Sequence, residues 1–365
     1  MSFFSFLKKN QRQQENKPKG ESKFLKQEAE FVEEQKRKGI GIKSALIEYA
    51  AISRGLKVDR LSSRLLIIES KEGNQFGFHN MNGNDSSRIG MNLCDRKHDS
   101  RHILKKKGIS VVDSEVFGIE HYDEAVEFAQ KLGFPVVVKP TSLARGKGIT
   151  TNIHTLEEFK KAWDKGCEAY QRKKSTNRLL VERHVSGDDY RFFVVGNKVI
   201  SATHRKRANV TGDGTSTVLE LIKQKNLLRA KNPYLSDYLI PEDPEQLDLL
   251  EKQKISLEDV PEKGREVTLR SQSNLSAGGD SIDVTETAHP DYHELAVRVI
   301  QSIPGIEYGG IDFIANDITK KPTTSNHIVS EVEFSPAPLS HFPFIGKGRD
   351  MAGAIIEHYL SKEKN

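Results

Sequence analysis

The stretch Phe134–Ile149, which reads FPVVVKPTSLARGKGI, constrains this chain most. Its three consecutive valines, 136–138, are typical of a short strand buried on both faces. The strand is expected to end at Lys139-Pro140, because proline cannot donate to a sheet ladder. The small and flexible residues that follow carry Arg145 and Lys147, so they predict a loop whose N–H groups and cations bind phosphate. A surface hairpin with solvated cations is the alternative.

Motif spacing and bulk properties exclude several classes of protein. The loop has neither the GxxxxGK[ST] spacing of a P-loop nor a Rossmann fingerprint. A chain of 365 residues is too long for one ordinary core and predicts two or three lobes. Cys94 and Cys167 match no zinc or CxxC spacing, which favours structural thiols in a reducing, cytoplasmic compartment. No apolar run approaches the roughly 20 residues that span a bilayer, so stable membrane insertion is not expected.

The net charge of +5 is concentrated near the N-terminus. Residues 1–40 contain ten Lys and Arg residues against six Asp and Glu residues, which leaves the remainder almost neutral. Nucleic acid is therefore not an expected partner, since no aromatic-basic interleaving is present. Residues 1–40 are predicted to form a basic tail, disordered over 1–20 and helical over 22–38.

Beyond the tail, helices and strands alternate without a repeat period, which predicts a mixed α/β chain. Thr155 and Glu158 predict a capping box at the start of a helix. A further helix is expected over Arg101–Lys107, and Ile109–Phe117 reads as an extended connection. Strands are expected at Leu65–Glu69, Gln75–His79, Leu179–Glu182, Tyr190–Val195, Lys198–Thr203, Val267–Arg270, Gly310–Ile314 and His327–Glu333.

Three carboxylates lie in apolar segments near the C-terminus. Asp312 is in GGIDFI, and Glu331 and Glu333 are two residues apart in HIVSEVEF, so the two glutamates point to the same face of a strand. Burying acidic residues is expensive unless they are paired or bind cations. Their convergence would make an oxygen site for Mg²⁺, whereas solvent-facing positions are the alternative for any one of them. Arg270, ahead of the small-residue loop SNLSAGGDS, would add charge neutralisation for phosphoryl transfer.

Taken together, the motifs resemble those of the ATP-grasp carboxylate–amine ligases, particularly the ATP-grasp portion of cyanophycin synthetase and of bifunctional glutathione synthetase. The resemblance implies an α/β ATP-grasp fold, in which two α+β lobes hold ATP between them. It also implies a small pre-ATP-grasp domain over 41–95 and an ATP-grasp domain over 96–362, divided into 96–185 and 186–362, with a helical insertion at about 219–262. The motifs follow the family order: GFPVVVKPTSLARGKGI, LLVERHVSGDDYRFFVVGNKVI, RANVTGDGTST, LRSQSNLSAGGDSIDVT, YGGIDFI and EVEFSP…GKGRD.

The same resemblance implies roles for individual residues. Lys139 and Arg101 would hold the α- and β-phosphates, and Asp189 would bind the ribose hydroxyls. A lid is implied over Gly146, Lys147 and Gly148, and adenine contacts are implied for Glu182 and the Val185 backbone.

Catalytic and metal-binding roles are implied in the same way. Arg270 would stabilise the transferred phosphoryl group, and Asn274 with Gly278–Gly279 would border an acyl phosphate. Arg191 and Arg205 would lie near the substrate carboxylate. Two Mg²⁺ ions, with Mn²⁺ as the alternative, are implied at Asp312, Glu331 and Glu333.

The implied activity is amide formation between a carboxylate and an amine, with an acyl phosphate made from ATP, and the expected substrates are amino acids or short peptides. The resemblance covers only a portion of either synthetase, so neither specific activity is expected of this chain. Glu333 stands where the family usually has Asn. The alternatives are a peptide- or protein-tagging ligase recruited by the tail and insertion, and a nucleotide-binding regulator without catalysis. A homo-oligomer is typical of such ligases.

Overall fold

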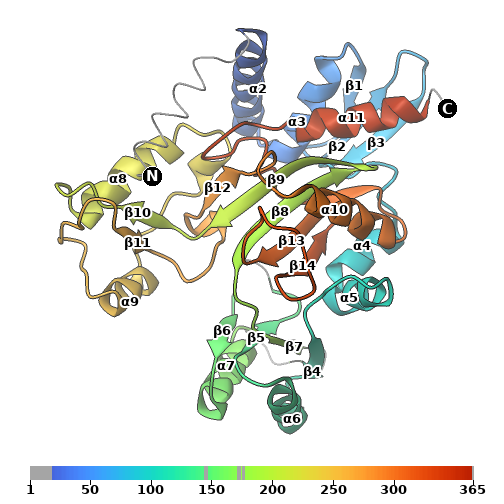
Figure 1. The fold of residues 1–365 in the computed structure, drawn as a ribbon. Helices are drawn as coiled ribbons and strands as arrows, with labels where there is room; N and C mark the ends of the chain where they lie inside the picture. The colour runs from blue at the N-terminus through green and yellow to red at the C-terminus, as the bar shows by residue number, and fades with distance from the viewer. Residues whose placement is uncertain (1–18, 144–146, 171–173, 175–176, 364–365) are drawn as a thin grey trace.

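The computed structural model describes residues 19–143, 147–170, 174 and 177–363, with side chains from Lys26 onward. The described residues form four sheets of three, two, five and four strands. The five-stranded sheet lies at the centre of the molecule (Figure 1). The expected disorder of residues 1–20 falls almost entirely on residues outside this description.

The N-terminal part is a three-stranded antiparallel sheet backed by helices. Its elements are α2 (Lys19–Arg37), α3 (Ile42–Ile52), β1 (Lys57–Arg60), β2 (Leu65–Glu69) and β3 (Gln75–His79), joined by the C-terminal α11 (Met351–Lys362). Leu46, Phe78 and Ile355 are fully buried in one core together with residues of the central sheet. Through this shared core, α3 packs against the central sheet and α11.

A four-stranded antiparallel sheet, in the order β4-β7-β5-β6, forms a separate lobe with two helices (Figure 1, green). All three valines of β5 are buried, as predicted. Val136 and Val138 pack with the apolar stripes of α6 and α7, whereas Val137 points to the opposite face of the sheet. The elements are β4 (Ser114–Gly118), α6 (Tyr122–Leu132), β5 (Val136–Pro140), β6 (Thr150–Ile153), α7 (Leu156–Glu168) and β7 (Arg178–Arg183). The two preceding helices, α4 (Arg88–Asp95) and α5 (Lys97–Lys106), lie between this lobe and the N-terminal part.

The central sheet has the strand order β12-β9-β8-β13-β14, with every pairing antiparallel. Its elements are β8 (Asp188–Val195), β9 (Lys198–Lys206), β12 (Asp280–Asp283), β13 (Tyr308–Ala315) and β14 (His327–Glu333). α10 (Pro290–Ser302) buries Tyr292 and Val299 with the apolar residues of this sheet. The other face carries the charged side chains described below.

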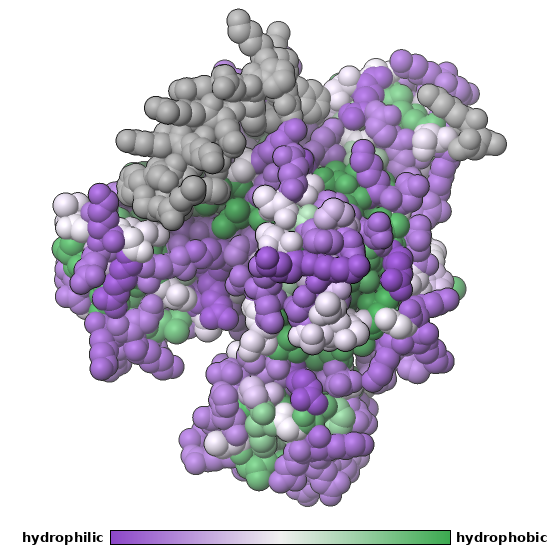
Figure 2. Space-filling view, viewed as in Figure 1, coloured by the Kyte–Doolittle hydropathy of each residue, from purple (hydrophilic) through white to green (hydrophobic). Residues whose placement is uncertain are grey.

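An insertion with its own small core lies at the far edge of the central sheet (Figure 1, yellow). It contains β10 (Asn209–Thr211), α8 (Val218–Arg229), η1 (Leu235–Asp237), α9 (Pro244–Lys252) and β11 (Glu266–Thr268), and the turn η2 (Leu275–Ala277) leads back to β12. Figure 2 shows a recess in the molecular surface between this insertion and the four-stranded lobe.

Several local expectations needed correction. The extended connection expected at Ile109–Phe117 runs into a paired strand, β4, because residues 114–118 pair with β7. Thr155 caps α7, but Glu158 accepts from the His154 N–H, so the reciprocal bond of a capping box is absent there. Thr217 and Glu220 form a complete capping box at the start of α8. Among the described residues, every helix is too short or too polar to cross a bilayer.

Candidate functional site

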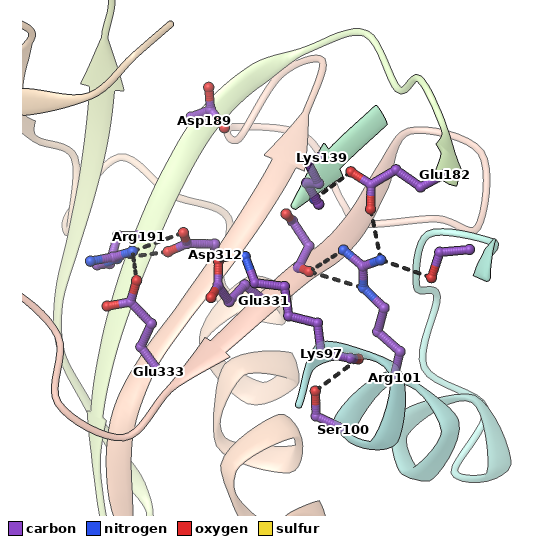
Figure 3. A network of polar contacts seen from close by, with 12 residues as sticks. Lys97, Ser100, Arg101, Lys139, Glu182, Asp189, Arg191, Asp312, Glu331 and Glu333 are labelled. Carbon is purple, nitrogen blue, oxygen red and sulfur yellow. Dashed lines mark hydrogen bonds and ion pairs between the residues drawn. The ribbon is translucent and has the colours of Figure 1, made fainter. Parts of the chain in front are cut away.

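Two cations at the edge of the four-stranded lobe share one buried carboxylate. Lys139 Nζ lies 2.5 Å from Glu182 Oε1, and Arg101 Nη1 lies 2.7 Å from Glu182 Oε2 (Figure 3). Lys139 is at the end of β5 and Glu182 is on the adjacent β7, while Arg101 reaches across from α5. Arg101 also donates to the Ser330 carbonyl on β14, which joins this lobe to the central sheet.

Charge, more than burial, decides the ionisation of Glu182. Burial would raise the pKa of this carboxyl, but Lys139 and Arg101 outweigh burial and lower the pKa to about 2. Burial lowers the pKa of Lys139, with Glu182 opposing that change. Both oxygens of Glu182 are therefore bound to the two cations in this structure, and its adenine contact stays a prediction.

The expected ribose and adenine positions lie in the loop and strand that follow β7. Asp189 begins β8 and accepts a 2.6 Å hydrogen bond from Ser273 Oγ. It lines a cavity of about 290 Å³ together with Gly187, Arg205 and Ser273. Val185 lies half-buried between β7 and β8. A polar cavity beside these residues has the character that a sugar or phosphate group requires.

Asp312, Glu331 and Glu333 converge at the centre of the site. Strands β13 and β14 pair Asp312 with Glu331 and Gly310 with Glu333, with a β-bulge after Asp312. One oxygen of each carboxylate lies within 4.8 Å of the others. Three carboxylate oxygens in this arrangement fit a hard divalent cation such as Mg²⁺. The expected metal ligands are thus brought together by the pairing of two strands.

Arginines neutralise this acidic cluster. Arg191 donates to both oxygens of Asp312, at 2.6 and 2.8 Å, and to Glu333 at 2.7 Å. Arg205 Nη2 lies 2.9 Å from Asp312. Burial would raise the pKa of Asp312, but the two arginines lower it to about 2. Burial, together with the neighbouring Asp312 and Glu331, raises the pKa of Glu333, although Arg191 and Arg205 oppose that rise.

The expected phosphoryl-stabilising residue, Arg270, is held by the insertion. It is only 3% exposed, and it donates to both oxygens of Asp243, at 2.6 and 2.5 Å. Asp243 is the N-cap of α9, where it also accepts from the Gln246 N–H. Asn274 donates to Gln272 at 3.0 Å. The insertion therefore supplies a carboxylate directly to Arg270.

Glycines permit close backbone approach on both sides of the site. Gly278 has a φ of +90°, and a Cβ there would lie 2.8 Å from Ile240 Cγ1. A Cβ on Gly279 would lie 2.9 Å from two carbonyl oxygens. Gly148 has a φ of +72°, with Pro140 and Ala169 packed against it, and Lys147 is exposed. Gly146 lies outside the described residues, so the expected lid is described only in part.

Sequence reasoning missed three residues of the site: Lys97, Asp243 and Lys43. Lys97 donates to Glu331 at 2.8 Å and lies one helical turn before Arg101 on α5. The sequence predicted a helix that begins at Arg101, whereas α5 begins at Lys97. A predicted helix that began at Lys97 would have placed Lys97 and Arg101, four residues apart, on one face. Asp243 and Lys43 have no such local signal, because they reach the site from the insertion and from the N-terminal part.

Comparisons with known proteins identify the fold of the chain. Residues 95–195 match the family model described as "Carbamoyl-phosphate synthase L chain, ATP binding domain". The structure is similar to a bifunctional glutathione synthetase from Pasteurella multocida, with a TM-score of 0.68 and 27% identity, over 88% of this chain and 44% of that one. The chain has the ATP-grasp fold.

The ATP-grasp chain is also similar to curated proteins along most of its length. It is 30% identical to a cyanophycin synthetase from Nostoc sp. over 89% of this chain and 36% of the relative. It is 30% identical to a glutathione biosynthesis bifunctional protein from Clostridium perfringens over 84% of this chain and 39% of the relative. The chain therefore spans little more than a third of the length of these relatives. The likeness to the ATP-grasp portion of the two synthetases is confirmed.

Proposed function

We propose that this protein is an ATP-dependent ligase that joins a carboxylate to an amine through an acyl phosphate. The observation that carries the proposal is a row of charged contacts beside β14, made by Glu331 and Glu333 of that strand and by side chains from α5, β5, β7, β8 and β13 (Figure 3). Cations fit for phosphate lie at one end of the row, and the three carboxylates lie in the middle. Arg270 is held by Asp243 of the insertion. This is the set of groups that phosphoryl transfer requires, since its catalysis consists of positioning and charge neutralisation.

Each group has a part in the proposed reaction. Lys139 and Arg101 would exchange Glu182 for the α- and β-phosphates of ATP, and Arg270 would bind the transferred phosphoryl group. Asp312, Glu331 and Glu333 would hold two divalent ions, Mg²⁺ or Mn²⁺, which supply Lewis-acid charge to the phosphates. The substrate carboxylate attacks the γ-phosphate and releases ADP. The amine then attacks the acyl carbon, and phosphate leaves.

The substrates that we propose are amino acids or short peptides. We also propose a cytoplasmic setting, where ATP is available and where the buried thiols of Cys94 and Cys167 would stay reduced. The test is a coupled assay of ADP and phosphate release over pairs of amino acids and dipeptides, with mass spectrometry of the product. Lys139→Met should abolish release, whereas Lys57→Met, at an exposed ion pair in β1, should not. Saturable ATP binding without turnover by any pair would contradict the proposal.

A second candidate is a nucleotide-binding regulator, which the acidic side chain of Glu333 favours. Glu333 adds a negative charge close to Asp312 and Glu331, and this charge would repel ATP phosphates when the metal is absent. Glu333→Asn separates the two functions. A loss of turnover would assign Glu333 to the metal geometry of an active ligase, whereas a large gain would indicate a site that has lost its activity.

A peptide- or protein-tagging ligase, with a partner recruited by the tail and the insertion, is the third candidate. Deleting residues 1–18 should then reduce turnover on a protein or peptide partner and spare basal ATP hydrolysis. Equal activity of the full-length and shortened proteins on that partner would exclude a recruiting role for the tail. Sedimentation analysis of the same proteins tests the proposed homo-oligomer.

A further inference from the structure

Arg229, the last residue of α8, is fully buried in the insertion. Its Nε and Nη2 atoms donate to the Tyr238 carbonyl, at 3.0 and 2.6 Å. Nη1 donates to the Gly279 carbonyl at 2.9 Å and to Asp280 at 3.3 Å, and Nη2 also donates to the Leu275 carbonyl at 3.3 Å. These bonds match the five N–H donors of a guanidinium. The arginine therefore joins two separate segments of backbone through one rigid group.

Two of the bonded carbonyls belong to the small-residue loop 274–279, which is predicted to border the acyl phosphate. Leu275 begins the turn η2 in this loop, and Gly279 ends the loop just before β12. The start of the loop faces the opposite way, because Ser273 Oγ donates to Asp189 and both residues line the polar cavity of about 290 Å³. The loop is thus held on the cavity side at Ser273 and on the insertion side by Arg229.

Asn226, three residues earlier on α8, fixes the segment beneath the same loop. Its amide donates to the Ile240 carbonyl at 3.0 Å and accepts from the Ile240 N–H at 2.8 Å. Ile240 packs so closely under Gly278 that a Cβ on this glycine would lie 2.8 Å from Ile240 Cγ1. Residues three apart lie on one face of a helix. One face of α8 therefore determines the backbone path of residues 238–240 and of the loop above them.

We propose that Arg229 is a positioning residue, which sets the loop 274–279 in the geometry that receives the transferred phosphoryl group. The inference rests on the proposed ligase function for the role of this loop. The planar fork of a guanidinium holds several carbonyls in fixed directions, whereas the ammonium of a lysine is a point charge on a flexible stem. Because catalysis of phosphoryl transfer depends on positioning, a displaced loop lowers the stabilisation of the transition state more than the binding of the nucleotide.

The test compares Arg229→Lys with Lys225→Met. Lys225 is the matched control, because it lies one turn earlier on the same helix, is buried and donates to the same Asp280 at 2.7 Å. Its other partner is the Asn209 carbonyl, which is outside the loop. Arg229→Lys keeps the positive charge beside Asp280 but loses the fork that holds the loop. Urea unfolding gives the folded fraction of each variant.

Calorimetric titration then measures the binding of two probes, Mg·ADP alone and Mg·ADP with aluminium fluoride, which mimics the phosphoryl group in transfer. Wild type should bind the fluoride complex more tightly than Mg·ADP. We expect Arg229→Lys to bind Mg·ADP within about twofold of wild type and the fluoride complex about tenfold or more weakly. Lys225→Met should bind both probes within about twofold of wild type. Should Arg229→Lys fail to fold, Asn226→Ala replaces it and should weaken only the fluoride complex, by about threefold.

The outcomes separate this inference from the proposed function. Equal weakening of both probes in Arg229→Lys, or the same selective loss in Lys225→Met, assigns Arg229 a structural role only and overturns the inference. Unchanged binding of both probes, or a wild type that does not prefer the fluoride complex, also overturns it. A selective loss in Arg229→Lys, without ADP release by any substrate pair, supports the inference while the ligase function fails.

Discussion

Arg191 and Asp312 lie directly opposite each other on the neighbouring strands β8 and β13 and form a two-pronged ion pair. Both side chains are less than a tenth exposed. Because Arg205 and Glu333 contact the same pair, the centre of the site is a network of two cations and two anions. Binding of a divalent ion by Asp312 therefore has to compete with guanidinium groups, which links metal binding to the position of the arginines.

Asp312→Asn should be strongly destabilising as well as inactive. The substitution leaves Arg191 and Arg205 buried with a weaker partner, which typically costs about 3–5 kcal/mol of unfolding free energy. Glu331→Gln is the control, because its partner Lys97 is one-third exposed and such a pair contributes about 0–1 kcal/mol. Urea unfolding measures both. Equal, small losses for the two variants would show that the Arg191–Asp312 pair adds little net stability.

Asp243→Asn should strengthen ATP binding. This change keeps the N-cap acceptor for Gln246 but removes a negative charge from the side chain that contacts Arg270. The KM for ATP should fall by about fivefold, which corresponds to roughly 1 kcal/mol of repulsion. Arg270→Met should instead lower kcat by about 10²–10³-fold.

Steady-state kinetics of both variants decides the role of Asp243. If Asp243→Asn loses as much kcat as Arg270→Met, the aspartate orients the arginine and does not compete with phosphate. Glu245→Gln, at 3.5 Å from Arg270 and half exposed, should change neither constant by more than about twofold.

Lys43 should make the free energy of unfolding depend on pH in the alkaline range. Burial lowers its pKa to about 8 from an ordinary 10.5, so the unfolded chain binds more protons between these values. The contribution of Lys43 to stability therefore rises as pH increases from 8 to 10.5, by up to about 3 kcal/mol. The unfolding free energy of wild type relative to Lys43→Met should increase over that range. A constant difference would contradict a lowered pKa.

Asp280→Asn should destabilise the packing of the insertion against the central sheet. Asp280 on β12 accepts from Lys225 at 2.7 Å and from Arg229 at 3.3 Å, and all three side chains are less than a tenth exposed. Removing the carboxylate leaves two buried cations, at a cost of about 3–5 kcal/mol. Thermal and urea unfolding measure this loss. Glu266→Gln is the control, because Glu266 forms an exposed pair with Lys206, and this substitution should cost less than about 1 kcal/mol.

Local pattern was sufficient for much of the fold. The valines of β5 are buried as their composition predicts, and the expected strands at 65–69, 75–79 and 327–333 have the predicted bounds. The strand β4 was missed, because the short segment SEVFG has little local strand signal and is fixed as a strand by its pairing with β7. Its stability comes from a partner more than sixty residues away.

What the sequence by itself determined is the chemical inventory and its spacing: a cation at the end of an apolar strand, two glutamates on one face of another, and an ordered set of motifs. These features are local, because side chains alternate strictly along a strand. The tertiary structure alone decided which charges meet. Glu182 binds Arg101 and Lys139, Asp243 binds Arg270, and Lys43 contacts Ser335 across 292 residues. Ion pairs act over a few ångströms in space, so their partners depend on how the separate lobes pack.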